Sequence, residues 1–335
     1  MSEQKIDLIT GRDRGPGRPD ATSSADERQS LTLGQVELSR VVEWTGGYAT
    51  TDELFPSLPS ELWRQHSSWL APEFFDAESS AWQANVQTWV LKSAGRTVLV
   101  DTGLGNDKQR EVAVFHRRTS DFLDRLAAAG VDPQDVDLVI NTHLHNDHVG
   151  WNTRLVDGEW VPTFPDAQYL INRTEFDYWN PANGHVPRSP FQNATDTGVT
   201  FDDSVFPVHR AGQAVLWEGS SHRIDDNLVL ELAPGHTPGS AVLHLESGDE
   251  RAVFVGDIIH TPLQVIHPDH DTCLSEDPAR ASRSRRRILQ EAADTNSLVV
   301  PAHLRGPGAF EVSHADGGFT LSGWAPFPST WVPEG

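Results

Sequence analysis

Cysteine is almost absent from this sequence. Cys273 is the only cysteine among 335 residues, so an intrachain disulfide and a structural metal site built from several thiolates are both excluded. Long apolar runs are absent too, because no stretch approaches the roughly 18 apolar residues of a membrane-spanning helix. The first thirty residues also lack the short apolar stretch of a secretory signal. We therefore expect a soluble, cytoplasmic protein with no membrane partner.

Positive charge is scarce. The chain has 26 Lys and Arg residues against 48 Asp and Glu residues, which gives a formal net charge of −22. Such a surface repels phosphate backbones and anionic membranes, so nucleic acid is not expected as a partner. The one basic run, residues 282–287, falls in a helix predicted to open at Asp277-Pro278. We interpret this run as a solvated helix face with acidic neighbours.

Large apolar side chains are nearly missing from residues 1–30, which are rich in charge, Gly, Pro and Ser. Such a composition cannot offset the entropy of ordering, so we predict a flexible N-terminal tail over residues 1–30. From Leu31 onward apolar and aromatic residues recur without a long linker or an internal repeat. The sequence therefore predicts one domain over residues 31–335.

Short apolar runs typical of buried strands alternate with helical patterns, which predicts an α/β protein. These runs cover residues 97–100, 138–140, 228–230, 253–255 and 298–300. The first leads into Asp101-Thr102-Gly103, and the other four lead to His143, His236, Asp257 and His303. Four predicted strands therefore end close to a side chain that can bind a metal ion.

The densest group of such side chains is the run His143-Leu144-His145-Asn146-Asp147-His148. Any one of these histidines alone would more readily be a polar loop residue. The set is different, because the pattern of an apolar run followed by a potential ligand recurs at His236, Asp257 and His303. Imidazole and carboxylate ligands together suit Zn²⁺, Mn²⁺, Co²⁺ or Fe. The sequence therefore predicts a metal site.

With these residues in view, the sequence resembles the metallo-β-lactamase superfamily, whose signature is His-x-His-x-Asp-His followed by a distant His, an Asp and a last His. The resemblance covers about residues 86–304 and implies an αββα sandwich with the site at one edge, between two sheets. It places two divalent metal ions, with zinc expected, on seven side chains. The first ion is assigned to His143, His145 and His236, the second to Asp147, His148 and His303, and Asp257 is placed between them. Asp101 matches a family carboxylate behind the ligands, where it can fix the tautomer of a histidine.

The residue at the position between the two ions, Asp257, narrows the set of subfamilies that the sequence resembles. The β-lactamases that use a cysteine ligand have it where this chain has Asp257. An Asp here resembles acyl-homoserine lactonases, glyoxalase II-type thioesterases and methyl-parathion-hydrolase-like enzymes. The run Gly256-Asp257-Ile258-Ile259-His260, followed by Gln264-Val265, resembles the last group most. His260 stands where many lactonases have a tyrosine.

The chemistry expected of such a site is hydrolysis. Two metal ions that share a water lower its pKa towards about 7, which supplies a metal-bound hydroxide as nucleophile. We assign catalytic roles to Asp147 as proton shuttle, to Asp257 between the ions, and to His260, which either hydrogen-bonds the substrate or caps its strand.

The favoured substrate is small, uncharged and ester-like, with a lactone or carboxylic ester ahead of a phosphotriester. Two alternatives stay open: a glyoxalase II-like thioesterase, and a non-hydrolytic metal or redox protein. Most of the eleven tryptophans are expected in the core or at the contacts of a homodimer. Trp151 is the candidate for a pocket wall, and residues 164–207 for an insertion that overhangs the site.

Overall fold

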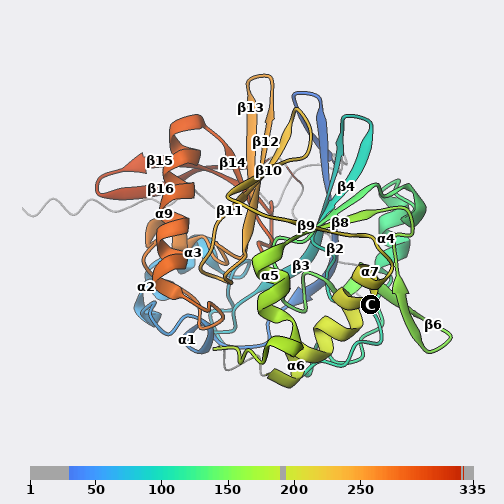
Figure 1. The fold of residues 1–335 in the computed structure, drawn as a ribbon. Coiled ribbons are helices and arrows are strands. Elements are labelled where there is room, and N and C mark those ends of the chain that lie inside the picture. Colours follow the sequence, from blue (N-terminus) through green and yellow to red (C-terminus); the bar gives the residue numbers. More distant parts are fainter. Residues whose placement is uncertain (1–29, 189–193, 326, 328–335) are drawn as a thin grey trace, which may run out of the picture.

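Two seven-stranded β-sheets pack face to face, and helices cover both outer faces (Figure 1). The computed structural model describes residues 30–188, 194–325 and 327. The first sheet consists of β1 (Ser30–Leu33), β2 (Val36–Gly46), β3 (Ala84–Ser93), β4 (Arg96–Val100), β5 (Leu138–Ile140), β8 (Gln168–Asn172) and β9 (Ala214–Trp217). The second consists of β10 (Ser221–Arg223), β11 (Leu228–Leu232), β12 (Ala241–Ser247), β13 (Glu250–Gly256), β14 (Leu298–Pro301), β15 (Phe310–Ala315) and β16 (Gly318–Trp324). This is the predicted αββα sandwich.

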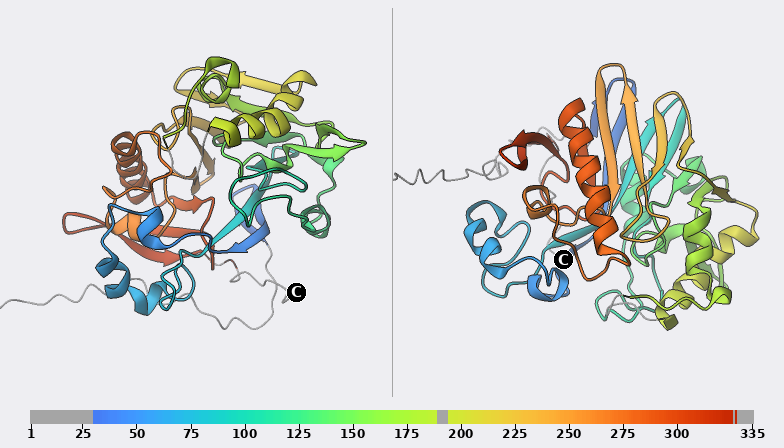
Figure 2. Two further views of the ribbon diagram at one scale, coloured as in Figure 1. Left: turned by 90° about the horizontal axis from the view of Figure 1, so that it is seen from below. Right: turned by 60° about the vertical axis from the view of Figure 1, so that its left-hand side comes forward.

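The helices fall into two groups, one on each side of the sheets (Figure 2). The long helix α9 (Pro278–Thr295) packs on the second sheet, and α4 (Phe122–Ala128) packs on the first. The other α-helices are α1 (Thr51–Leu54), α2 (Ser60–Gln65), α3 (Ser67–Leu70), α5 (Arg173–Trp179), α6 (Ala194–Thr200), α7 (Phe206–Arg210) and α8 (Leu263–Ile266). Short 3-10 turns η1 (Pro133–Asp135), η2 (Gly150–Asn152) and η3 (Pro181–Asn183), the π-helical turn η4 (Phe201–Val205), and the hairpin β6 (Thr153–Val156) and β7 (Glu159–Pro162) complete the fold.

Alternation along each strand explains the layers. In β4, Val98 and Val100 enter the core between the sheets, whereas Leu99 packs in the cluster that contains Phe122 of α4. In β13, Phe254 enters the core between the sheets, while its neighbour Val253 joins the cluster beneath α9. Both faces of these strands are therefore buried, as expected for nearly continuous apolar runs with period-2 geometry.

Strand direction decides where the site forms. In the first sheet β4, β5, β8 and β9 run parallel to one another. In the second sheet β13 and β14 are parallel, and β11 has the same direction because it is separated from β13 by the antiparallel β12. The carboxyl ends of these strands therefore meet along one edge of the sandwich.

The five predicted strands all lie within observed ones, namely β4, β5, β11, β13 and β14. The helix predicted at Asp277-Pro278 is α9, and the Asp277 side chain accepts a hydrogen bond from the Arg280 N–H as its N-cap. The predicted tail lies outside the described residues except for Ser30, which already begins β1. The division into a tail and one domain therefore stays a prediction.

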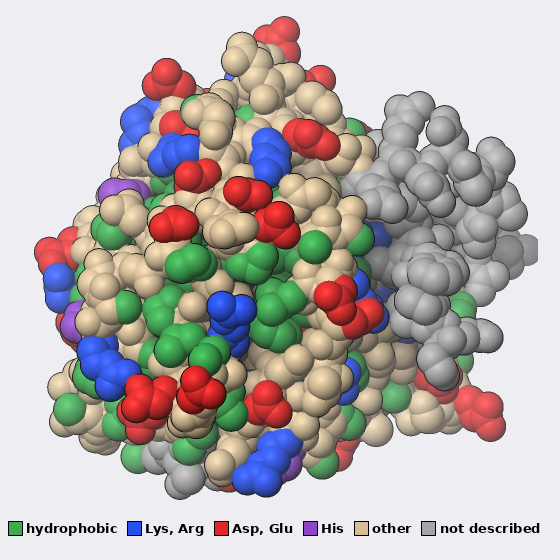
Figure 3. Space-filling model, turned by 90° about the vertical axis from the view of Figure 1, so that its right-hand side faces the viewer, with side chains coloured by type: hydrophobic (Ala, Val, Ile, Leu, Met, Phe, Trp, Pro, Cys, Tyr) green, Lys and Arg blue, Asp and Glu red, His purple; other side chains and the backbone are tan. Residues whose placement is uncertain are grey.

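The surface mixes charges of both signs. Figure 3 shows the face that carries β6 and α7, where hydrophobic side chains gather and acidic and basic groups are interspersed around them. Leu155 and Val156 of β6 and Phe206 of α7 are among the exposed hydrophobic residues. Among the described residues, no helix is both long enough and apolar enough to cross a membrane.

Candidate metal centre

Loops that follow four strands bring all seven predicted ligands to the same edge of the sandwich. The loop after β5 carries His143, His145, Asp147 and His148, and the ends of β11, β13 and β14 are followed by His236, Asp257 and His303. Six of these side chains are buried, and Asp147 is partly exposed. Potential ligand atoms of these residues form two groups, each within 4.8 Å: His143, His145, His236 and Asp257 in one group, and Asp147, His148 and His303 in the other.

In the first group the imidazoles converge on His236. Its Nε2 lies 3.2 Å from Nε2 of His143 and 3.0 Å from Nδ1 of His145. Burial lowers the pKa of His143 and of His145 well below the usual histidine value, and the neighbouring histidines lower both further. These rings are therefore neutral near pH 7, which leaves lone pairs available for a cation.

In the second group His148 and His303 approach each other, with 3.2 Å between their Nε2 atoms. The Nε2 of His303 also lies 3.4 Å from an Asp147 oxygen. Burial lowers the pKa of both histidines, but the nearby carboxylates, above all Asp257, raise it by more. The carboxylates around these two rings therefore favour positive charge there, as a bound cation would supply.

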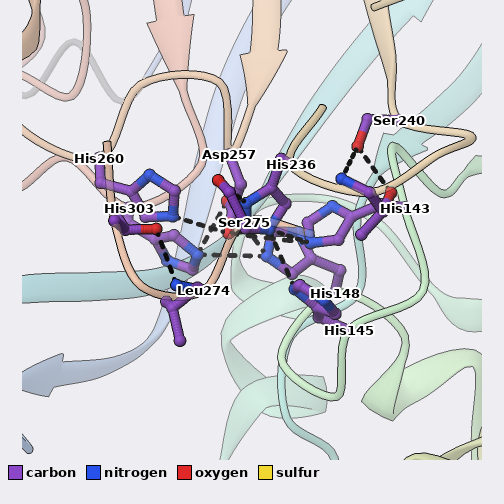
Figure 4. A network of polar contacts seen from close by, with 12 residues as sticks. His143, His145, His148, His236, Ser240, Asp257, His260, Leu274, Ser275 and His303 are labelled. Atoms are coloured by element: carbon purple, nitrogen blue, oxygen red, sulfur yellow. Dashed lines mark hydrogen bonds and ion pairs between the residues drawn. The ribbon is translucent and has the colours of Figure 1, made fainter. Parts of the chain in front are cut away.

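Asp257 stands between the two groups, with one carboxylate oxygen toward each (Figure 4). Its Oδ2 lies 3.3 Å from His236 Nε2 and 3.7 Å from His143 Nε2. Its Oδ1 lies 3.3 Å from His148 Nε2 and 3.1 Å from His303 Nε2. Burial raises the pKa of this carboxyl, but the surrounding histidines hold it well below its usual range. An ionised carboxylate with this orientation can contact a cation in each group.

The donor set fits divalent metal ions. Two buried ring nitrogens in or beside the site have no hydrogen-bond partner: His145 Nε2 and His260 Nδ1. Buried polar atoms without partners are uncommon in folded proteins, and lone pairs from imidazole and carboxylate are what Zn²⁺ and similar ions bind. The residues present therefore fit the pair of ions that the sequence predicts.

Outer hydrogen bonds fix the orientation of the rings. Asp101 Oδ2 lies 2.8 Å from His148 Nδ1, and Asp101 also accepts from the Thr142 N–H at 2.8 Å. The Nδ1 of His303 lies 2.8 Å from the Asn85 carbonyl oxygen. Each contact holds one ring nitrogen, so that the other points into the site. Asp101 thus lies where the sequence places it, behind a ligand.

His260 follows Asp257 closely and reaches the same carboxylate. Its Nε2 lies 3.1 Å from Asp257 Oδ2, and its backbone N–H donates to Gln264 Oε1 at 2.8 Å. The ring is buried, lines the cavity above the site, and has its pKa lowered by burial. Both predicted roles, a contact with substrate and a strand-end cap, are compatible with this position.

The cavity beside the site has an apolar wall that faces the polar side chains of the metal ligands. Its aromatic lining comes from Trp44, Tyr48, Trp82 and Phe115, and the ring centroids of Tyr48 and Phe115 are 5.3 Å apart. Asp147 and His260 border the cavity on the side of the metal ligands. Among the described residues that line it, none is Lys or Arg. The cavity therefore offers apolar contact and no cationic partner.

The prediction of Trp151 as a pocket wall was wrong. Trp151 is buried away from the cavity, where it stacks on Phe122 and donates from Nε1 to Glu43. None of the described residues lining this cavity comes from residues 164–207, but Trp179 of this segment packs on the predicted ligand His145, with 5.4 Å between the ring centroids, so its place over the site stays a prediction. The walls instead come from β2, β3 and the segment before α4, because long-range packing sets which aromatic rings turn toward the ligands.

The interpretation of the basic run was also wrong at two residues, Ser284 and Arg285, which are buried. Arg286 and Arg287 form exposed ion pairs with Asp269 and Glu231, as a solvated face requires. Arg285, however, is fully buried: its Nε donates to the Ile258 carbonyl oxygen at 2.6 Å, and its Nη2 pairs with Asp271. It therefore holds the segment that follows Asp257.

Two buried carboxylates, Glu43 and Glu175, were not identified from the sequence. Glu43 accepts from the Leu104 N–H at 2.6 Å and from Trp151 Nε1 at 2.8 Å. Glu175 accepts from the Leu144 N–H at 3.0 Å and from groups on the His236 loop. The only hint at Glu175 is its place one helical turn before Trp179 on the buried side of α5.

Comparisons with known proteins agree with this geometry. The family model described as "Metallo-beta-lactamase superfamily" matches residues 82–303. The chain is 29% identical over 230 residues to human metallo-beta-lactamase domain-containing protein 1, which covers 68% of this chain and 65% of that protein. It is 27% identical over 130 residues to the N-acyl homoserine lactonase AttM of Rhizobium radiobacter, covering 35% of this chain and 38% of the relative. The matches thus span less than two thirds of either relative.

Solved structures show the same fold. The hydrolase AbOPH of the beta lactamase superfamily superposes with a TM-score of 0.73 at 22% identity, covering 90% of this chain and 97% of that one. AidC, described as a dizinc quorum-quenching lactonase, superposes with a TM-score of 0.70 at 22% identity and the same coverage. At this identity the likeness extends to the fold.

Proposed function

The chain belongs to the metallo-β-lactamase superfamily, and from this premise we propose that this metal-dependent hydrolase cleaves a small, uncharged, ester-like bond at a centre of two metal ions. A lactone or carboxylic ester is favoured over a phosphotriester. The observation that carries the proposal is the position of Asp257, whose two oxygens face the two separate ligand groups.

Seven side chains would hold the two ions. His143, His145 and His236 would take one, Asp147, His148 and His303 the other, and Asp257 would contact both. Zinc is the expected metal, since histidine and carboxylate ligands suit it and AidC, of the same fold, is described as dizinc. When bound, two divalent cations supply Lewis acidity for a carbonyl or phosphoryl oxygen and make water more acidic.

The protein's own groups would orient the substrate and move protons. Asp147 is the most exposed ligand, with 18% of its side chain accessible, and it borders the cavity. A carboxylate in this position can carry a proton to the leaving group as the bond breaks. His260 lies on the cavity wall, where it can contact the substrate beside Asp257.

The walls of the cavity favour uncharged substrates. Trp44, Trp82 and Phe115 offer apolar surface, and no Lys or Arg lines the described part of the cavity. A thioester of glutathione or coenzyme A would bring a charged carrier without a cationic partner at the wall, and the net charge of −22 adds repulsion. The acyl part of a neutral lactone or ester needs only apolar contact and a few polar groups.

Hydrolysis by the zinc-loaded enzyme across four substrate classes tests this proposal. The panel contains an N-acyl homoserine lactone, an aryl carboxylic ester, a dialkyl aryl phosphotriester and a glutathione thioester. We expect kcat/KM for the lactone or the aryl ester to exceed that for the thioester at least about tenfold, a difference of about 1.4 kcal/mol in transition-state binding. A preference for the thioester would instead support the glyoxalase II-like alternative. Tightly bound iron without hydrolysis would support the redox alternative.

A further inference from the structure

Glu175 is a carboxylate buried beneath the ligand loops, with four hydrogen-bond donors around it. Its Oε1 accepts from the Leu144 N–H at 3.0 Å and from Trp179 Nε1 at 2.6 Å. Its Oε2 accepts from Thr237 Oγ1 at 2.7 Å and from the Gly239 N–H at 2.9 Å. Only 1% of the residue is exposed.

The two oxygens serve two different loops. Leu144 lies between His143 and His145 in the loop after β5, so Oε1 is tied to the loop of the first sheet. Thr237 follows His236 directly in the loop after β11, so Oε2 is tied to the loop of the second sheet. Three potential ligands of one ion thus come from two loops that meet on one carboxylate.

The site around Glu175 is built for an acceptor. An ionised carboxylate only accepts hydrogen bonds, whereas an amide would turn an NH₂ group toward at least one of these donors. Burial raises the pKa of Glu175 above its usual value, and the four donors offset only part of that rise. The packing is close, because a Cβ on Gly239 would lie 2.4 Å from the Glu175 backbone nitrogen. The His236 loop therefore rests directly on α5.

We infer that Glu175 is a positioning residue that holds His236 at its distance from His143 and His145, and thereby sets the affinity for the ion these three would bind. The inference rests on the proposed metal centre. The separations of 3.0 and 3.2 Å between His236 Nε2 and the other two rings are set by loops from different sheets. Outer partners of metal ligands commonly change metal affinity or activity 10- to 100-fold when they are removed, about the size of effect expected here.

Glu43 provides a matched control. It is also buried and accepts from a backbone N–H (Leu104), an indole N–H (Trp151) and a hydroxyl (Ser120). None of these donors lies between two ligands of the first group or on the His236 loop. Replacing Glu43 with Gln therefore also turns an NH₂ group toward hydrogen-bond donors. It does not disturb the contact between the loop of His143 and His145 and the loop of His236.

The test compares Glu175→Gln, Glu43→Gln and wild type as metal-free proteins titrated with Zn²⁺ against a chromophoric chelator. We expect Glu175→Gln to bind one of its two ions about 10- to 100-fold more weakly, with both wild-type affinities retained by Glu43→Gln. Thermal unfolding of the metal-free proteins should show similar losses for the two variants. Amide exchange at Leu144 and Gly239 should quicken in metal-free Glu175→Gln.

Each outcome decides a separate point. A wild-type protein that binds fewer than two ions contradicts the proposed metal centre itself. Two normal affinities in a less stable Glu175→Gln protein overturn the inference alone, as does an equal loss of affinity in Glu43→Gln. Where Glu175→Gln does not fold, Thr237→Val removes a single donor from the His236 loop. An unchanged Zn²⁺ isotherm in that variant also overturns the inference.

Discussion

Among single residues, Asp257 is the one whose two oxygens face different ligand groups. The closest histidine nitrogens to Oδ1 and Oδ2 among the proposed ligands lie at 3.1 and 3.3 Å. No other described carboxylate of the centre has a comparable position. Its removal would leave two cations without the anion between them, and like charges at short range repel strongly in a buried site.

We expect Asp257→Ala to lose metal and turnover together, with activity reduced more than about 100-fold, beyond the range usual for outer partners. Metal content and kcat/KM on a lactone, an aryl ester and a phosphotriester measure this. His260→Ala is the comparison, because His260 contacts the same carboxylate but is not assigned as a ligand. That variant should keep its metal and change the ranking of the substrates. Full metal content and activity in Asp257→Ala would contradict the bridging role.

The residues that the sequence could and could not identify differ in a physical way. The seven proposed ligands could be identified because His and Asp residues closely follow apolar runs, and four of them lie within six residues. Glu175 and Glu43 bind backbone and indole N–H groups, which every sequence offers in number. Glu175 lies 62 positions from Thr237, and Glu43 lies 61 from Leu104. Such partners become visible only when the chain is folded.

Among whole elements, the strands that precede the proposed ligands could be predicted from the sequence, whereas the hairpin and the cavity wall could not. The runs that became β5, β13 and β14 are apolar and buried on both faces, so their composition is distinctive. The hairpin of β6 and β7 has an exposed, mixed pattern, which composition alone cannot separate from a loop. The aromatic cavity wall is likewise set by the packing of β2, β3 and the segment before α4.

Gly150 shows how tightly the segment after the ligand loop packs on its neighbour. Its N–H donates to the Gly103 carbonyl oxygen at 2.7 Å. A Cβ at Gly150 would lie 1.9 Å from the backbone carbon of Leu104. The segment that carries Asp101 would therefore have to move away.

We expect Gly150→Ala to lower the free energy of unfolding by about 1 to 3 kcal/mol, the usual cost of overpacking. Urea denaturation of the metal-free protein measures it. Gly318→Ala, where a Cβ meets nothing within 4 Å, controls for the change in chain entropy and should fall within about 0.5 kcal/mol of wild type. Equal stabilities for the two variants would contradict the packing argument.

Lys108 fastens the segment between β4 and α4 to the hairpin and to η4. Its Nζ donates to Thr153 Oγ1 at 2.6 Å and to the Asp203 carbonyl oxygen at 2.9 Å, and lies 3.6 Å from the centre of the Trp160 ring. Burial lowers its pKa to about 7, while Asp203 raises it and Arg110 lowers it. The amine therefore approaches neutrality where an unfolded lysine stays charged.

This shift predicts a pH dependence of stability. Between pH 7 and 10.5, the folded and ordinary pKa values, the unfolded chain binds more protons at Lys108 than the folded chain, so stability at this site rises with pH. Wild type should therefore gain stability relative to Lys108→Met as pH increases across this window. Denaturation of the metal-free proteins at several pH values measures the difference. A constant difference would show that the folded lysine keeps its ordinary pKa.

For the molecule as a whole, the proposed metal centre would couple the stabilities of both sheets, because its ligands come from both. Imidazole and carboxylate groups from four loops converge there, and neither ligand group contains a Lys or Arg among its described side chains. An ion that binds only the folded state adds stability by mass action. The gain is about 2.7 kcal/mol when the free ion concentration is one hundred times the Kd of the site.

Removal of metal with a chelator should therefore lower Tm for the entire domain, and Zn²⁺ should restore it in proportion to its free concentration. Calorimetry with and without metal measures this shift. The Asp257→Ala protein is the reference, since it should unfold at nearly the same temperature in both conditions. A wild-type Tm that does not respond to metal would show that metal binding at the centre does not stabilise the folded domain.

The order of strands gives the chain an additional property. Every strand of the first sheet precedes every strand of the second, and only the short segment 218–220 separates β9 from β10. Four proposed ligands lie before this junction and three after it. A break there would divide the chain into two polypeptides, each with a whole seven-stranded sheet and only part of the proposed ligand set. The proposed hydrolysis would then require both pieces and the metal together, so that neither piece alone would be active.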